Sequence, residues 1–586
     1  MKLSLLRGRA LAPCFALAVF SALSLASYFE LFQAKGFLFL ACFLLFGAAS
    51  GLRATRRERV VFALLSLLFS FMRVAGRSYD LYDSHVLLMK NAASMLHAAA
   101  AMAALFFCAF SGFLLLHRLV CGLLIPAPEQ EKRMPEGRFF ASLVFILILG
   151  SVPYLLLYTP GLNIADTRDQ LLQFFGYPSY IGDGSALSDH HPVLTTLLYG
   201  GFMKLGLLLG SANRGQLLYS AASILAFSFS LSYLLLTLAR LGMRRQLARG
   251  IAAFYALWPV PALYAFNMGK DSTVIPFVLL FACQLLILFR KEERPGAGFY
   301  VGLAANAFLL MVLRKSASYC LLASLVFLLS CLPGRRKGTA AAFLSAIVLF
   351  AGYNALLPRL GVIPGETREI LSLPVQQAAR ALRDEEVSPE DAENLGRFLD
   401  LETAATLYDP RLSDPVKDRT NPEATGEDLL SFAKGWISVG VRHPSCFLSA
   451  WMNMIYGYFY PSDSNTILCL TLNSPEAGEL SLSQNSGFKG LRLAFHNFVY
   501  FRLRRVPGLS PLFYVSGVVF TFLFLFSALW ASRGFSAAAP FAFFLCTLGI
   551  AMFSPKSGEI RYILPLVYAL PAMLGALSLS GREGKP

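Results

Sequence analysis

The stretch "FFASLVFILILGSVPYLLLYTPGLNIADTRDQLLQFFGYPSY" (residues 139–180) decides the fold class. Its first twenty residues, 139–158, carry no charge, and a helix needs about 20 apolar residues to cross the hydrocarbon core of a bilayer. Two aspartates, an arginine and two glutamines crowd residues 166–173, shortly beyond that segment. The stretch therefore predicts a transmembrane helix that ends at a polar loop equipped for chemistry.

The composition extends this prediction to the whole chain. Of 586 residues, 56% are hydrophobic and only 15% are charged, whereas soluble domains carry about 25% charged residues. Long apolar segments recur, near 10–30, 34–52, 60–75, 94–122, 139–158 and 216–239 among others. We predict an all-α polytopic membrane protein with about fourteen spans.

The net charge of +16 comes from lysines and arginines that cluster in short loops, such as "RATRRER" (53–59), "EQEKRMPEGR" (129–138) and "RLGMRRQLAR" (240–249). Such loops are typical of the cytoplasmic side, and they also meet anionic lipid headgroups, so no nucleic-acid partner is predicted. If 193–210 crossed the membrane, the four arginines of 240–249 would lie outside. We therefore expect an interfacial or re-entrant helix there.

This topology places the protein in the cell (inner, cytoplasmic) membrane as a multi-pass protein, with both termini cytoplasmic. It divides the chain into four parts: N-terminal spans of unknown role (1–125), a transmembrane core (139–357) whose first outer loop is 159–192, an extracytoplasmic domain (358–508), and C-terminal spans (509–580). The third part is predicted to be mainly helical and holds most of the acidic residues. Its Cys446 and Cys469 could form a disulfide or remain two thiols.

The polar residues of the opening stretch have a helical spacing. Asp166, Asp169, Gln170 and Gln173 fall at i, i+3, i+4 and i+7, which is one face of a helix that begins near Asp166. Such a strip at the boundary of lipid and water suits a reaction centre. Alternatively, Asp166 is the N-cap and Asp169 completes a capping-box-like pair.

The next polar element is "SDHHPVL" (188–194), where Pro192 suits the first position of the interfacial helix. His190 and His191 would lie at its mouth. Metal ligation, acid–base work and interfacial polarity are all open for them. Adjacent histidines point to different sides of an extended backbone, which favours hydrogen bonding to a substrate or to the aspartates.

Three predicted outer loops carry cations at the ends of spans: Lys270, Arg314, and Arg561 with Tyr562. Outward-facing cations need partners. A lipid phosphate is one such partner, and snorkelling or pairing with a nearby acid is the alternative. A carboxylate base beside phosphate-binding cations at membrane depth is what transfer of a sugar from a polyprenyl phosphate needs.

Several motifs carry a family resemblance. In order they are "DTRDQ", "DHHPVLTTLL", "GKDS", "LPVQQAAR" (373–380), "DPVK" (414–417) and "GYFYP" (457–461). Their order and spacing from about 139 to 580 resemble an uncharacterised family of large bacterial membrane proteins that is grouped with the GT-C glycosyltransferase superfamily. The resemblance implies a GT-C-like helix bundle and leaves the N-terminal spans uncovered.

The resemblance also implies roles for individual residues. Asp166 matches the catalytic aspartate of a D-x-x-x-Q pattern with Gln170 as its companion, and His191-Pro192 matches a helix opening. The superfamily more often pairs its first acid with a neighbouring acid, a place that Asp169 could take. The remaining assignments follow position: Arg314 and Arg561 as phosphate-binding cations, and Gln376, Gln377 and Arg380 closing the cavity from the long loop or packing on a helix surface.

By this likeness the expected reaction is inverting transfer of a hexose or pentose from a polyprenyl-phosphate donor to an envelope glycan, lipid or protein at the outer face of the membrane. The cofactor stays open, because some branches of the superfamily use a divalent metal and others use none. Two alternative functions remain: a glycan polymerase or ligase that uses diphosphate-linked donors, and a lipid or glycan transporter. A transporter often shows internal repeats, and this sequence has none that we can detect.

Overall fold

The computed structural model describes residues 8–124, 134–180, 182–289, 295–332, 334–365 and 367–579. Both termini and the first half of the basic loop predicted at 129–138 lie outside these residues. The regular structure of the described residues is helical apart from two short strands, which confirms the all-α class. Cys446 and Cys469 are both free thiols.

The helices fall into four groups along the chain. The N-terminal group consists of α1 (Gly8–Tyr28), α2 (Lys35–Ser50), α3 (Arg56–Tyr82), α4 (Val86–Met89) and α5 (Ala92–Leu124). The central group consists of α6 (Glu136–Leu157), α7 (Ala165–Phe174), α8 (Val193–Leu208), α9 (Ala212–Arg240), α10 (Arg245–Leu257), α11 (Pro259–Tyr264), α12 (Lys270–Thr273), α13 (Ile275–Leu288), α14 (Ala297–Leu313), α15 (Ser316–Cys331) and α16 (Arg336–Leu356).

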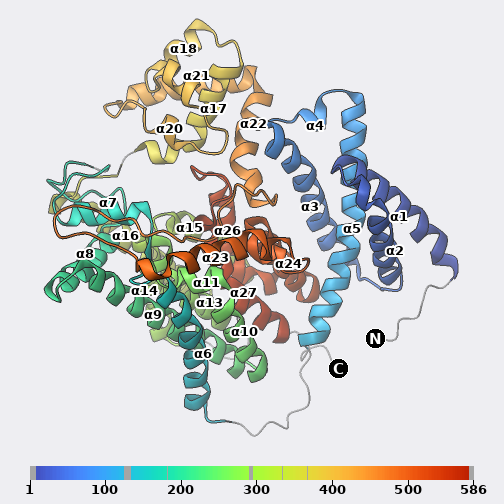
Figure 1. Cartoon of the computed structure of the whole chain (residues 1–586), viewed down its shortest axis with the longest axis horizontal. Coiled ribbons are helices and arrows are strands. Elements are labelled where there is room, and N and C mark those ends of the chain that lie inside the picture. Colours follow the sequence, from blue (N-terminus) through green and yellow to red (C-terminus); the bar gives the residue numbers. More distant parts are fainter. Residues whose placement is uncertain are drawn as a thin grey trace.

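The third group consists of α17 (Ser372–Asp384), α18 (Pro389–Gly396), α19 (Leu401–Leu407), α20 (Asp414–Lys417), α21 (Gly426–Arg442), α22 (Pro444–Ile455) and α23 (Lys489–Phe501). Helices α17 to α21 form an outer lobe, and α22 connects this lobe to the bundle. The C-terminal group consists of α24 (Val515–Arg533), α25 (Phe535–Ala538), α26 (Ala542–Ala551) and α27 (Ile560–Leu579). Figure 1 shows the lobe above the helix bundle and α1 to α5 along one side of it.

Within the described residues, ten helical segments are long and apolar enough to cross a membrane: α1, α2, α3, α5, α6, α9, α12 with α13, α16, α24 and α27. The sequence predicted about fourteen spans. The other apolar helices are Val193–Leu208, Ala297–Leu313, Ser316–Cys331 and Phe535–Ala551, each of 10–17 residues. A straight helix of 16 residues is about 24 Å long, short of the roughly 30 Å hydrocarbon core.

Local sequence signals explain where several long helices begin. The side chain of Thr55 accepts a hydrogen bond from the backbone of Glu58, and Glu58 accepts one from the backbone of Thr55, which closes a capping box at the start of α3. Ser211 caps α9 by accepting from the Arg214 backbone. Pro192, expected at the first helical position, is instead the N-cap residue of α8.

The outer lobe has a hydrophobic core of its own, in which Val375, Leu395 and Phe432 are buried apart from the main bundle. The region predicted as one domain, 358–508, therefore comprises this lobe, the α22 connection, an irregular segment after Tyr460, and α23. The buried ammonium of Lys417 lies 2.9 Å from Glu369 and 2.8 Å from Asp414, and so joins α20 to the helical turn before α17.

Two loops of the bundle are tied together by a short parallel pairing. Strand β1 (Leu162–Asn163) pairs with β2 (Asn267–Met268), with Leu162 opposite Asn267 and Asn163 opposite Met268. The Thr167 hydroxyl donates to the Met268 carbonyl, which fixes α7 against the same loop. The pairing therefore brings the residues after β1 beside those after β2, which are Asp166 and Lys270.

Candidate functional site

Helix α7 presents the polar face predicted from its spacing. Asp169, Gln170 and Gln173 are buried, and the side chain of Asp166 is 24% exposed. The N-cap residue of α7 is Ile164, and no side chain caps this helix. The capping interpretation of Asp166 is therefore wrong, because its carboxylate is engaged elsewhere.

The carboxylate of Asp166 lies between two cations that come from other helices. Its Oδ2 atom is 3.0 Å from Lys270 Nζ at the start of α12 and 3.6 Å from Arg561 Nη1 at the start of α27. Burial by itself would raise the pKa of Asp166, but the two cations, Lys270 foremost, hold that pKa below its ordinary value. Asp166 is thus ionised and paired.

The loop before α27 holds Arg561 in place. Glu559 lies 3.5 Å from Arg561 Nε and 2.7 Å from Lys556 Nζ, so Arg561 is shared between two carboxylates. The preceding Gly558 has φ +59°, and a Cβ atom there would lie 2.3 Å from Asn465. Only glycine fits this turn, which packs against the predicted "GYFYP" motif through Gly457.

His191 completes the surroundings of Lys270. Its Nδ1 atom lies 3.2 Å from Lys270 Nζ, and an ammonium can only donate, so Nδ1 accepts and the imidazole proton is on Nε2. Burial, together with the charge of Lys270, lowers the pKa of His191 well below its ordinary value. His191 is therefore a neutral orienting group for Lys270. The ring of His190 packs edge-on against it at 4.7 Å.

The second aspartate of α7 has a different environment. Asp169 pairs with its neighbour Arg168 at 3.0 Å, and that guanidinium is 43% exposed. Burial raises the pKa of Asp169 despite this arginine. Asp166 and Asp169 are therefore distinct: the first lies between two partly buried cations, and the second has a single, half-exposed one.

Gln170 connects α7 to α8. Its Nε2 atom donates to Thr195 Oγ1 at 2.7 Å and to Thr196 Oγ1 at 2.9 Å, whereas its buried Oε1 atom has no partner. Gln173 donates to the Ser188 carbonyl at 3.3 Å, and its Oε1 also lacks a partner. These two acceptors leave α7 with unmet hydrogen-bonding capacity beside Asp166.

Arg314 lies in the same charged region. Its Nε atom is 3.4 Å from Asp271, the residue after Lys270, and its Nη2 donates to the Tyr562 carbonyl at 2.8 Å. The Arg561 guanidinium lies 5.8 Å from the Tyr562 ring. The structure therefore brings Lys270, Arg314, Arg561 and Tyr562 together, although the sequence separates them widely.

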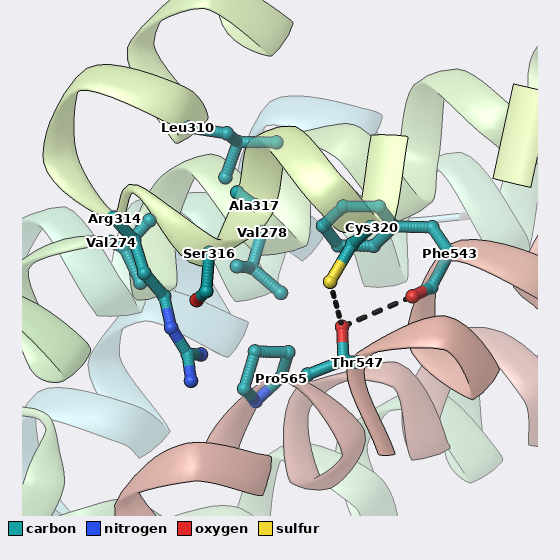
Figure 2. Close-up of a pocket in the computed structure, with 10 residues that line it drawn as sticks. All are labelled: Val274, Val278, Leu310, Arg314, Ser316, Ala317, Cys320, Phe543, Thr547 and Pro565. Atoms are coloured by element: carbon teal, nitrogen blue, oxygen red, sulfur yellow. Dashed lines mark hydrogen bonds between the residues drawn. The ribbon is translucent and has the colours of Figure 1, made fainter. Parts of the chain in front are cut away.

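A narrow pocket continues from Arg314 between α13, α15, α26 and α27. Figure 2 shows the Arg314 side chain at one side of it and the Thr547 hydroxyl, hydrogen-bonded to Cys320 and Phe543, at the other. Val274, Val278 and Pro565 supply apolar walls. The buried Nη1 of Arg314 has no partner, so one donor of the charged region remains unmet.

Three predicted binding residues belong to the outer lobe instead. Gln376 donates to the Asp409 carbonyl at 2.6 Å, and Gln377 donates to the Phe447 carbonyl at 3.2 Å while accepting from Trp436 at 3.1 Å. Arg380 donates to the Asp83 carbonyl at 3.0 Å. These bonds join the lobe helices to one another and to the end of α3, which favours the packing interpretation over cavity closure.

We therefore expect Gln377→Ala to weaken the lobe and not the site. Removing one donor and one acceptor of buried hydrogen bonds costs about 1–3 kcal/mol, which limited proteolysis of the lobe would register as faster cleavage. Lys434→Ala, an exposed position on α21, should leave the cleavage rate unchanged. If Gln377→Ala resists protease as well as the wild type does but binds substrate more weakly, Gln377 is a substrate-binding residue after all.

Sequence reasoning gave no role to Thr195, Thr196 and Asp189, and it considered Asp271 and Glu559 only as nearby acids that could pair with Lys270 and Arg561. Thr195 and Thr196 lie in the first turn of α8, where they accept from Gln170. Asp271 pairs with Arg314, and Glu559 pairs with Arg561 as expected. Lys315, which follows the predicted cation Arg314, lies 2.7 Å from Asp189, beside the histidines. The available signal was adjacency, since each of these acids lies within three residues of a predicted cation or histidine.

The charged region does not suit a divalent cation at Asp166. Two cationic side chains already lie within 3.6 Å of its carboxylate. Across the residues that the structure describes, no group of three or more His, Cys, Asp or Glu side chains could hold a metal ion.

Within the part of the chain that the structure describes, these features define an all-α protein with ten candidate membrane spans and a charged cluster, centred on the Asp166 carboxylate, at helix ends. Residues 181–584 match a family of unknown function, DUF6020, and the chain belongs to that family. Lys270, Arg314 and Arg561 lie inside the matched region, and Asp166 lies before it. No match was found among curated proteins or among solved structures.

Proposed function

We propose that this protein is a GT-C-type membrane glycosyltransferase that moves a sugar from a polyprenyl-phosphate donor to an envelope glycan, lipid or protein. One observation carries the proposal: the Asp166 carboxylate lies 3.0 Å from Lys270 Nζ and 3.6 Å from Arg561 Nη1, beside Arg314 with a free buried donor. A potential base and a set of anion-binding cations thus occupy one place.

The ion pairs suggest how the donor engages the site. Its phosphate competes with Asp166 for Lys270 and Arg561, and the cations turn toward the stronger anion. Asp166 then loses its partners and gains a negative neighbour, and both changes raise its pKa toward that of a working base. In this scheme the donor itself activates the base.

The transfer step follows from these positions. The acceptor hydroxyl attacks the anomeric carbon from the face opposite the phosphate, and Asp166 takes the hydroxyl proton as the new C–O bond forms. The bond from the anomeric carbon to the phosphate oxygen breaks, and its electron pair leaves with the polyprenyl phosphate. Lys270 and Arg561 stabilise the departing charge, and the configuration inverts. We place this reaction at the extracytoplasmic face of the cell membrane.

Donor choice tests the proposal. The full chain in proteoliposomes should transfer label from polyprenyl-monophosphate sugars, because Lys270 and Arg561 both reach the Asp166 carboxylate and can turn to one phosphate there. Transfer only from diphosphate-linked oligosaccharides would instead establish a polymerase or ligase. Movement of an intact lipid-linked sugar across the bilayer, with no new glycosidic bond, would make the protein a transporter and overturn the enzymatic proposal.

A further inference from the structure

Helix α23 (Lys489–Phe501) lies against the bundle at the same end as α7. Arg492 donates to the Leu157 carbonyl at the end of α6 at 3.2 Å, and the Phe495 ring packs against Tyr158 at 6.3 Å between centroids. Figure 1 shows α23 running across the direction of α6 rather than along it. With 13 residues it is too short to cross a bilayer.

The helix is apolar on both of its faces. Phe495, Val499 and Tyr500 face the bundle and pack against its core. The opposite side is apolar apart from Asn497, since Leu491, Leu493, Phe498 and Phe501 are each between 53% and 61% exposed. A helix that lies on a water-facing surface has a polar outer face. The outer face of α23 therefore suits the boundary between acyl chains and headgroups.

The charges of this segment itself all have one sign, and the acid that pairs with it from elsewhere, Asp463, lies 3.8 Å from the buried Arg504. No aspartate or glutamate occurs between Glu479 and Glu559, a stretch that includes the whole of α23 and the turns after it. The exposed cations Lys489, Arg502 and Arg505 form no ion pair with any residue that the structure describes. A shallow groove on the outer face is lined by Ala494, Asn497, Phe498, Phe501 and Arg502.

We propose that α23 and the turn after it, residues 489–505, form a binding surface for anionic phospholipid of the surrounding bilayer. The four exposed apolar side chains enter the acyl region, and Lys489, Arg502 and Arg505 contact headgroup phosphates. This surface is separate from the Asp166 cluster. The inference does not rest on the proposed sugar transfer.

The test places a fluorophore on the outer face. Phe498→Trp is introduced into the full chain, which is reconstituted in nanodiscs of equal parts phosphatidylcholine and phosphatidylglycerol. Bromine, which quenches tryptophan on contact, is carried on the acyl chains of one lipid or of the other. The signal of the unsubstituted chain, with its four tryptophans, is subtracted. We expect brominated phosphatidylglycerol to quench position 498 at least about twofold more than brominated phosphatidylcholine.

Two charge variants complete the design. Replacing Lys489, Arg502 and Arg505 with Gln should bring the two quenching levels together. Replacing Arg397, Arg419 and Lys434 of the outer lobe removes the same charge elsewhere and should preserve the difference. Equal quenching by both lipids in the Phe498→Trp chain would overturn the preference for anionic lipid. No quenching by either lipid would overturn the contact itself, provided that the chain elutes as the wild type does.

Discussion

Asp166→Asn should lower kcat for sugar transfer by about 10²-fold or more, the scale expected for loss of a general base. Asparagine keeps the size of the side chain and still accepts a hydrogen bond from Lys270, so the local packing survives. Arg561 retains Glu559 at 3.5 Å and is not left unpaired. The measurement is initial-rate transfer from a labelled polyprenyl-phosphate sugar, with kcat and KM determined separately.

The separation of kcat from KM is what identifies the role. In the wild type the donor phosphate must displace Asp166 from Lys270 and Arg561, and in the variant that competing charge is gone. Donor KM should therefore stay level or fall while kcat collapses. A purely structural aspartate would change both constants through loss of folded protein, which elution volume and thermal unfolding would reveal.

Asp169→Asn is the matched control, because it makes the same exchange three residues along the same helix. Asp169 is paired with the half-exposed Arg168 and lies outside the cation cluster, so transfer should remain within a few-fold of the wild type. Burial raises the pKa of Asp169, so by pKa alone Asp169 is a stronger base than Asp166. If kcat collapses in Asp169→Asn while Asp166→Asn keeps normal activity, Asp169 is the general base and not Asp166.

Much of the fold could be predicted from hydropathy, because lipid as solvent leaves a strong signal. The span expected at 139–158 is α6 at Glu136–Leu157, and the span expected at 216–239 is α9 at Ala212–Arg240. The number of spans was harder to predict from the sequence. Hydropathy alone does not separate a crossing helix from a short apolar one such as Ala297–Leu313 or Ser316–Cys331.

The site was predictable where local spacing determines it, and only there. The periodicity of α7 was enough to put Asp166, Asp169 and Gln170 on one face. It could not exclude capping, because that depends on where the helix begins, and it begins one residue earlier, after Ile164. The pairing of Asp166 with Lys270 and Arg561 depends on contacts between distant loops that leave no local pattern.

The lobe residues show a second limit of sequence reasoning. Gln376, Gln377 and Arg380 are polar residues on an amphipathic helix, a pattern that a cavity wall and a domain core share. What distinguishes the two is the partner of each side chain, such as the Phe447 carbonyl for Gln377, which comes from another helix. Long-range hydrogen bonds of this kind decide the role, and sequence periodicity carries no information about them.

Lys270→Met should raise donor KM by about 10- to 100-fold, because a hydrogen bond to a charged group contributes about 1.5–3 kcal/mol. The Nζ atom of Lys270 is held between Asp166 at 3.0 Å and the acceptor nitrogen of His191 at 3.2 Å, so it is positioned before the donor arrives. Methionine retains most of the apolar stem. Asp166 keeps Arg561 at 3.6 Å and so is not an unpaired charge.

Inhibition by the leaving group separates phosphate binding from any other effect of Lys270→Met. Free polyprenyl phosphate presents the same anion as the donor, so its inhibition constant should rise by a similar factor, whereas neutral polyprenol should inhibit both proteins equally. Lys315→Met is the control, since that lysine is held by Asp189 at 2.7 Å, and it should leave both constants nearly unchanged. If polyprenyl phosphate inhibits Lys270→Met as strongly as the wild type, the phosphate must bind elsewhere. Arg314, with its unmet buried donor, is then the cation to replace next.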